Sequence, residues 1–208
     1  MAATKADRVL AQIRAAGMVR PRDLAAEGIT HQYLQSLHRR GLLTRTGRGL
    51  YTLPDAAERF DEHAALAEVA KRMPGGVICL LSALRFHDLT TQAPFEVWVA
   101  VEHSAYVPRD PEAAVPLRVV YFSGAAFTEG VEEHAVNGVA VRVYSPAKTV
   151  ADCFKYRNKI GLDVALEALR ETWRERRATM DELWRYAKVC RVANVMRPYL
   201  ASLSLLEG

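Results

Sequence analysis

Short apolar patterns with helical spacing, each ended by a glycine or a proline, occupy the first third of the chain. Apolar side chains recur at helical spacing over residues 6–16 and end at a glycine. Pro21 opens a second, short helix that stops at Gly28, because proline is tolerated at the first helical position. Thr30 caps a third helix that runs to about Arg40. The pattern predicts the order helix, short helix, turn, helix.

An extended segment follows these helices and predicts a β-hairpin over residues 42–53. Two glycines in the segment 46–49 turn the chain back, and Pro54 ends the return strand. Three helices followed by a hairpin is the order of elements in a winged helix-turn-helix, with the hairpin as the wing. We therefore expect a winged helix-turn-helix DNA-binding domain over residues 1–54, a connector over 55–60, and a C-terminal domain over 61–208.

The remaining sequence predicts a mixed α/β domain. A helix from Asp61 precedes an extended apolar segment at 77–80 and a short helix at 82–87. Strand-like patterns follow at residues 95–101, 117–122, 131–136 and 139–144, and Asn137-Gly138 joins the last two as a hairpin. Three helices begin near residues 145, 162 and 179, before an apolar segment at 194–206 that Pro198 interrupts. The fold class is α+β: an N-terminal winged helix-turn-helix followed by a mixed α/β domain with a small sheet and terminal helices.

The charge is distributed unevenly along the chain. Residues 1–54 hold nine Lys and Arg against three Asp and Glu, a net charge of +6. Residues 55–208 hold nineteen basic and twenty-one acidic side chains, a net charge of −2, so that the whole chain carries +4. A compact basic module indicates a polyanionic partner. A solvated basic face without a partner is the alternative.

The third helix decides between these alternatives. Its inner face is apolar, and its outer face carries Gln32, Gln35, Ser36 and Arg39. Glutamine and arginine can bond two adjacent groups on a base edge in the major groove. No carboxylate lies between Thr30 and Leu53 to repel a phosphate. The expected DNA-binding residues are Arg20, Arg22, Thr30, His31, Gln32, Gln35, Ser36, Arg39, Arg40, Arg45 and Arg48.

Catalytic patterns are missing. A nucleotidyltransferase site needs two carboxylates one residue apart to hold Mg²⁺, but Trp98 follows Glu96 at that spacing. The three cysteines have no CxxC spacing, and the histidines are scattered. We expect no enzyme activity, no catalytic residue, no cofactor and no metal. Without a signal peptide or a membrane span, we expect a cytoplasmic location and no membrane partner.

Lys148 breaks one local rule. It lies in the first turn of the helix after Ser145-Pro146, where the helix dipole favours anions. Such a departure marks either a functional position or a salt bridge to Asp152 one turn later.

Four segments in this order resemble the AbiEi family, the antitoxins and transcriptional regulators of bacterial type IV toxin–antitoxin (abortive-infection) systems. They are the segments 48–54 (RGLYTLP), 82–89 (SALRFHDL), 94–100 (PFEVWVA) and 143–152 (VYSPAKTVAD). Ala147-Lys148 departs from the acidic residue and arginine of many relatives.

The resemblance implies a bacterial antitoxin with two activities. Its winged helix would bind inverted repeats in its own promoter and repress the operon. Its C-terminal domain would neutralise a nucleotidyltransferase-like toxin, with or without direct contact, and the residues assigned to this are Ser82, His87, Lys148 and Asp152. Either a monomer or a weak dimer could occupy inverted repeats. The alternatives are an effector-responsive repressor without antitoxin role and a nucleotidyltransferase-type enzyme with a DNA-targeting head.

Overall fold

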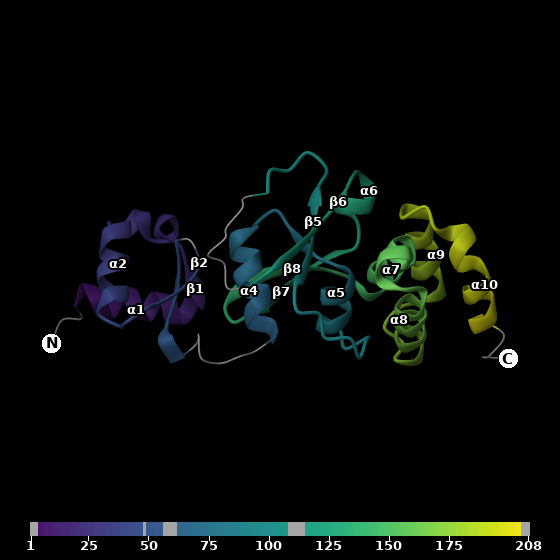
Figure 1. Cartoon of the computed structure of the whole chain (residues 1–208), viewed down its shortest axis with the longest axis horizontal. Coiled ribbons are helices and arrows are strands. Elements are labelled where there is room, and N and C mark those ends of the chain that lie inside the picture. Colours follow the sequence, from purple (N-terminus) through teal and green to yellow (C-terminus); the bar gives the residue numbers. More distant parts are fainter. Residues whose placement is uncertain (1–3, 48, 56–61, 108–114, 205–208) are drawn as a thin grey trace. The chain divides into compact units, whose positions relative to one another are not determined.

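The computed structural model describes residues 4–47, 49–55, 62–107 and 115–204, which divide into two compact units (Figure 1). Unit 1 falls within residues 1–75, 106–116 and 134–141, and unit 2 within residues 76–105, 117–133 and 142–208. The expected connector 55–60 lies outside the described residues except for Asp55. The division into functional domains at residues 1–54 and 61–208 stays a prediction.

Unit 1 begins with the three expected helices. Helix α1 spans Lys5–Ala16 and starts in a capping box between Thr4 and Asp7. The second helix, η1 (Pro21–Glu27), is a 3-10 helix rather than an α-helix. This tighter geometry is usual for short helical segments at connections. Helix α2 spans His31–Arg39.

A three-stranded antiparallel sheet completes this N-terminal module. The strands are β1 (Met18–Val19), β2 (Thr44–Gly47) and β3 (Leu50–Thr52), in the order β1-β3-β2. The β2–β3 hairpin was expected, whereas β1 was not, because two residues show no alternation. The core of the module joins all three helices to the sheet through Val9, Ile13, Val19, Leu24, Ile29, Leu34, Leu37, Leu43, Tyr51 and Leu53. Helix α4 (Glu62–Arg72) also belongs to unit 1 and packs against β1.

A five-stranded mixed sheet forms the centre of the rest of the chain, in the order β6-β5-β4-β8-β7. Its strands are β4 (Val77–Ile78), β5 (Val97–Glu102), β6 (Leu117–Phe122), β7 (Val131–Val136) and β8 (Val139–Tyr144). Strand β4 pairs antiparallel with β5 and parallel with β8, and β5 pairs parallel with β6. Asn137 and Gly138, which join β7 to β8, both have positive φ, as the expected hairpin requires.

Strand β5 corrects one expectation. The alternating pattern was placed at residues 95–101, but the strand begins at Val97, and its first five residues are all buried. Because successive strand residues point to opposite faces, this burial shows that both faces of β5 are covered, so its alternating pattern does not separate a buried from an exposed face. Phe95 precedes the strand and is 84% exposed.

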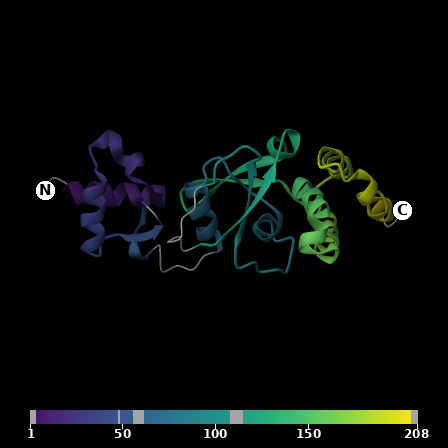
Figure 2. The same ribbon diagram turned by 45° about the horizontal axis from the view of Figure 1, so that its top comes forward.

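Unit 2 also contains the helices α5 (Leu80–Phe86), α6 (Ala125–Thr128), α7 (Pro146–Ile160), α8 (Leu162–Arg174), α9 (Met180–Val189) and α10 (Ala193–Ser204). Helices α5 and α6 contact strand β5, whereas α8, α9 and α10 pack on α7 or on one another. Helices α7 and α8 pack against each other (Figure 2). Leu162, in the first turn of α8, is exposed. Pro198 lies inside α10 instead of interrupting the segment.

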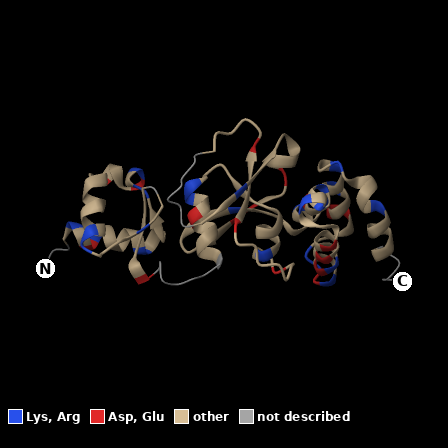
Figure 3. Cartoon of the chain, in the orientation of Figure 1, with Lys and Arg blue, Asp and Glu red and all other residues tan. Residues whose placement is uncertain are grey.

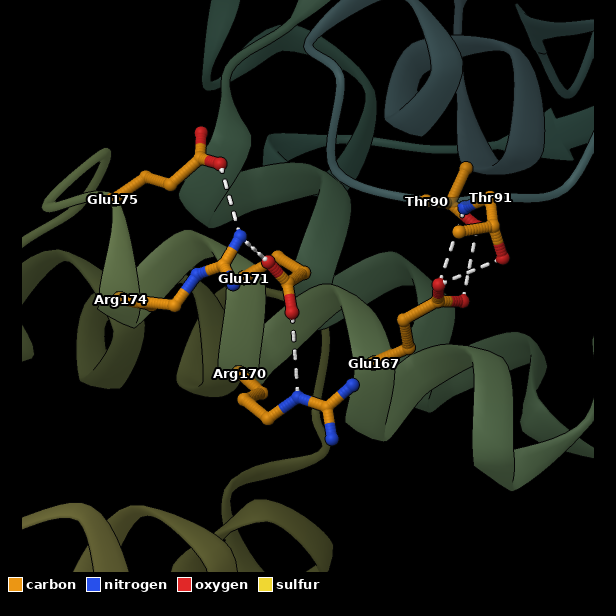
Figure 4. A network of polar contacts seen from close by, with 7 residues as sticks. All are labelled: Thr90, Thr91, Glu167, Arg170, Glu171, Arg174 and Glu175. Atoms are coloured by element: carbon orange, nitrogen blue, oxygen red, sulfur yellow. Dashed lines mark hydrogen bonds and ion pairs between the residues drawn. The ribbon is translucent and has the colours of Figure 1, made fainter.

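A polar network ties the loop after α5 to helix α8 (Figure 4). The carboxylate of Glu167 accepts hydrogen bonds from the backbone N–H and the hydroxyl of Thr91, at 3.1 and 3.0 Å, and from the hydroxyl of Thr90 at 3.1 Å. One turn further along α8, Glu171 pairs with Arg170 and Arg174. No helix in the described ranges has both the length and the apolarity to cross a bilayer.

Candidate nucleic-acid interface

Helix α2 is fixed at its start by a side-chain cap and along its inner face by two leucines. The hydroxyl of Thr30 accepts a hydrogen bond from the backbone N–H of Tyr33 at 3.3 Å. Leu34 and Leu37 are fully buried in the core of the N-terminal module. These contacts fix the orientation of the helix within the N-terminal module.

The outer face of α2 is polar and exposed, as expected from the sequence. Gln32, Gln35 and Arg39 are exposed, and Ser36 is half-buried. The structure brings these four side chains onto one face. Their role in reading bases stays a prediction.

Two histidines of α2 contact the ring of Tyr51 in strand β3. The rings of His31 and His38 each meet the Tyr51 ring edge-on, with centroids 6.4 Å apart. Nδ1 of His38 donates a hydrogen bond to the carbonyl of Leu43 at 2.9 Å. From the sequence, His31 is an expected DNA-binding residue, and His38 flanks the same polar face. The structure shows that they also brace α2 against the β2–β3 hairpin.

The hairpin presents Arg45 on its exposed side. Nε of Arg45 donates a hydrogen bond to the carbonyl of Gly47 at 3.1 Å, beside an irregularity in the β2–β3 register. This bond holds the guanidinium close to the hairpin backbone. Arg48, the second basic residue expected here, lies outside the described residues.

Arg20 and Arg22 flank the first residue of η1, next to a carboxylate. The side chain of Arg22 is 64% exposed, and its Nε lies 3.8 Å from Asp23. Arg20 is half-buried, and burial lowers the pKa of its guanidinium. Asp23 also pairs with Lys71 at 3.5 Å. Two cations thus contact this carboxylate, which limits its repulsion of a phosphate nearby.

The carboxylates of the N-terminal module are separated from its polar face. Asp7 lies on α1, and Asp23 and Glu27 lie on η1. Helix α2 and the β2–β3 hairpin carry none, so their charges are all positive (Figure 3). An acid-free surface of this kind attracts a polyanion over a distance of about one Debye length, roughly 10 Å at 0.1 M salt.

Lys5 is a basic residue beside α2 that the sequence did not single out. Its Nζ donates a hydrogen bond to the carbonyl of Gly28 at 3.2 Å and lies 5.0 Å from the centre of the Tyr33 ring. Lys5 thereby ties the start of α1 to the turn before α2. Only the tertiary fold brings these residues together, so no local pattern indicated the contact.

The four residues assigned to toxin neutralisation are all buried. The hydroxyl of Ser82 accepts a hydrogen bond from the backbone N–H of Trp98 at 2.9 Å, and Nε2 of His87 donates to the carbonyl of Tyr144 at 2.8 Å. Lys148 forms the salt bridge to Asp152 that was one of its two interpretations. Such residues act by supporting the fold, and a part in neutralisation stays a prediction.

Unit 2 buries its three cysteine thiols and the side chain of Tyr144. Burial raises the pKa values of the thiols of Cys79, Cys153 and Cys190, and all three cysteines are free. Burial also raises the pKa of the Tyr144 hydroxyl, which donates to the carbonyl of Phe127 at 2.8 Å. Within the described part of the chain, no group of three or more His, Cys, Asp or Glu side chains could hold a metal ion.

Sequence comparison identifies the segment that carries this basic face. Residues 8–54 match the family described as "Transcriptional regulator, AbiEi antitoxin". The AbiEi match starts within α1 and ends just after β3, so it includes α2 and the hairpin with their exposed basic residues. It confirms the resemblance to the AbiEi family for this part of the chain.

A solved structure shares the fold over a longer stretch than the AbiEi segment. The crystal structure of the RV2827C protein from Mycobacterium tuberculosis is similar with a TM-score of 0.60 at 15% sequence identity. The similarity covers 88% of this chain and 71% of that protein. At this identity the likeness concerns the fold alone. No curated protein matches the sequence significantly.

Proposed function

We propose that this chain is an antitoxin of a bacterial type IV toxin–antitoxin system that also represses its own promoter. Residues 4–53 would act as a winged helix-turn-helix, with α2 as the recognition helix and the β2–β3 hairpin as the wing. The DNA target would be an operator with inverted repeats. The C-terminal part would neutralise a nucleotidyltransferase-like toxin, in the cytoplasm and without catalysis of its own.

The observation that carries this proposal is the outer face of α2. Gln32, Gln35 and Arg39 extend into solvent from a helix whose inner face is locked by Leu34 and Leu37. A helix held in this way fits the major groove, and glutamine and arginine are suited to adenine and guanine edges. The AbiEi match over the same residues supports a regulatory role for this face.

The basic residues around this face suit phosphate contacts. Arg40 and Arg45 are exposed at the end of α2 and on the hairpin. The hydrogen bond from Arg45 to Gly47 reduces the entropy that the side chain loses on binding. Thr30 lies at the start of α2, where the backbone N–H groups and the helix dipole favour an anion.

The antitoxin half of the proposal rests on the family alone. The residues assigned to it are buried, so the surface above them would have to act on the toxin or its substrates. Co-expression of a candidate nucleotidyltransferase-like toxin with the full chain should restore growth. Loss of that rescue in a variant that still represses the promoter would separate the two activities.

The DNA-binding half is tested by gel shift on the promoter that precedes the reading frame. We expect the wild-type chain to bind this fragment more tightly than a shuffled fragment of equal length. Arg39→Ala should weaken binding to the promoter by about five- to 150-fold, the loss expected for a base contact worth 1–3 kcal/mol. Lys188→Ala serves as the matched control, because it removes one exposed positive charge from α9 in unit 2. Equal effects of the two substitutions would contradict the proposal.

A further inference from the structure

The two edges of the five-stranded sheet differ in how they are protected. Sheet edges carry unpaired backbone N–H and C=O groups, and proteins usually blunt them with charges, prolines or bulges. Strand β7, at one edge, exposes Glu132 and Glu133. Strand β6, at the other edge, contains no proline and no acidic residue, and its six residues pair with β5 in regular register without a bulge.

The single charge on β6 is engaged by its neighbours in the sheet. Nε of Arg118 lies 3.5 Å from the carboxylate of Glu96, and the guanidinium stacks 5.2 Å from the centre of the Trp98 ring. Tyr121, on the other face, is 49% exposed. Strand β6 is therefore mostly apolar, and the side chain of Arg118, its one charged residue, contacts residues of its own sheet.

One hydrogen bond shows which backbone groups of β6 point outward. The carbonyl of Phe122 accepts from the N–H of His103 at 2.9 Å, so this carbonyl faces β5. Backbone groups of successive strand residues point to opposite sides, so those of Leu117, Val119 and Tyr121 point away from β5. In the described ranges no other strand pairs with β6.

We propose that this edge pairs with β6 of a second copy of the chain, antiparallel about a two-fold axis at Val120. In this register Val119 of each copy faces Tyr121 of the other and exchanges backbone hydrogen bonds with it. The exposed Tyr121 ring is then covered by an aliphatic neighbour, a favourable cross-strand pair. The sheets of the two copies join into one continuous sheet.

The position of the charge selects this register over its neighbours. Residues that face each other across the axis must lie on the same sheet face, so the axis can shift only by whole residues along β6. An axis at Val119 would bring the two Arg118 side chains to a diagonal separation of about 7–8 Å on one face. An axis at Tyr121 would leave Leu117, Arg118 and Val119 without partners in β6. The axis at Val120 separates the arginines and keeps five strand residues paired.

Sedimentation equilibrium of the full chain without DNA tests the pairing. We expect a monomer–dimer equilibrium in the wild type. Tyr121→Lys should raise the dimer dissociation constant by on the order of tenfold or more, because it places two like charges diagonally across the axis. Ala135→Lys is the matched control, since it adds the same charge to the exposed side of β7. A monomer at every concentration, or equal effects of the two variants, would overturn the proposal.

A cross-link tests the register with a milder substitution. Facing Val120 residues form a pair without hydrogen bonds, with Cα atoms about 4.5 Å apart, a distance that a disulfide can span. Val120→Cys treated with oxidised glutathione should give a covalent dimer that reducing agent separates, whereas the wild type, with buried cysteines, should give none. Absence of this product would overturn the assigned axis. Both experiments omit DNA, so their outcome is independent of promoter binding.

Discussion

Nζ of Lys148 lies 2.8 and 2.6 Å from the two carboxylate oxygens of Asp152, and the Lys148 side chain is completely buried. The ammonium also lies 4.0 Å from the centre of the Tyr144 ring and 4.9 Å from that of Phe122. The thiol of Cys190 donates to Asp152 at 3.2 Å. The Lys148 ammonium thus has a carboxylate and two aromatic rings as partners, and Asp152 also accepts from the Cys190 thiol, which offsets part of the cost of burying the charges.

Breaking this buried pair should cost far more than breaking an exposed salt bridge. Lys148→Met leaves the Asp152 carboxylate buried without its cation, and we expect the free energy of unfolding to fall by about 3–5 kcal/mol at pH 7. The double variant with Asp152→Leu should recover most of this loss, because no charge remains in the core. Urea unfolding of both variants measures the difference. A single variant as stable as the wild type would contradict this description of the pair.

The same variant should respond to pH in a defined direction. Burial raises the pKa of Asp152, and Lys148 opposes the rise, so removal of Lys148 raises the pKa further. When the pKa of a carboxyl is higher in the folded state than in the unfolded state, the folded state becomes less stable as pH rises above the unfolded pKa of about 3.9. The loss of stability in Lys148→Met should therefore be smaller at pH 4 than at pH 7.

An exposed ion pair serves as the comparison. Arg174→Ala, which breaks the pair with Glu171, should lower the free energy of unfolding by about 0–1 kcal/mol.

The Lys148–Asp152 pair shows which features of the fold could be predicted from local sequence signals and which could not. The i, i+4 spacing of Lys148 and Asp152 was visible, as was the unfavourable position of a cation at a helix start. The sequence left two interpretations open, because burial depends on the aromatic rings of β6 and β8, which come from distant segments. The helices of the N-terminal module, with their caps and glycine stops, were predictable because each depends on local signals. Strand β1 and the contact of Lys5 with Gly28 depend on tertiary packing, and no local signal indicates them.

Arg176 and Arg191 offer a second test, because both have positive φ values of 53° and 58°. Each follows the end of a helix, where glycine is the usual residue in a left-handed conformation. Replacing either arginine by glycine should stabilise the chain by about 0.5–1 kcal/mol, since the left-handed strain of a residue with a Cβ is removed. Thermal unfolding measures the gain. Arg170→Gly, at an exposed position inside α8, is the control and should destabilise by about 1 kcal/mol.

The capping box of α9 predicts a dependence on pH. The backbone N–H of Thr179 donates to the Glu182 carboxylate at 2.8 Å and is the main cause that lowers the pKa of Glu182. A carboxyl with a lowered pKa stabilises the fold above its unfolded value, about 4.3, and this contribution is lost as pH falls through the folded value. Glu182→Gln should therefore be less stable than the wild type by about 0.3–1 kcal/mol at pH 7, with a smaller difference at pH 3.

A matched variant separates the capping box from the general charge of the helix start. Asp181→Asn removes a neighbouring charge of the first turn and leaves the bonds between Thr179 and Glu182 intact. If Asp181→Asn and Glu182→Gln showed the same pH profile in guanidinium unfolding, the capping box would not be the cause.

The residues on the outer face of α2 could be predicted individually, because helical periodicity determines which side chains share a face. The basic residues on the hairpin were also visible, although the bond from Arg45 to Gly47 depends on the irregular register of β2 and β3. The assignment of Ser82 and His87 to toxin neutralisation came only from the family resemblance. Their burial depends on β5 and β8, which pack against α5 only in the folded chain.

The most direct test of the central claim is a fluorescence titration of promoter and shuffled DNA at several salt concentrations, with Gln35→Ala and Arg45→Ala compared to the wild type. If α2 reads bases and the hairpin contacts phosphate, Gln35→Ala should lower the ratio of promoter to shuffled affinity and keep the salt slope. Arg45→Ala should weaken both DNAs alike and reduce the slope by about one. Unchanged affinity, ratio and slope in both variants would contradict the claim that this face binds DNA.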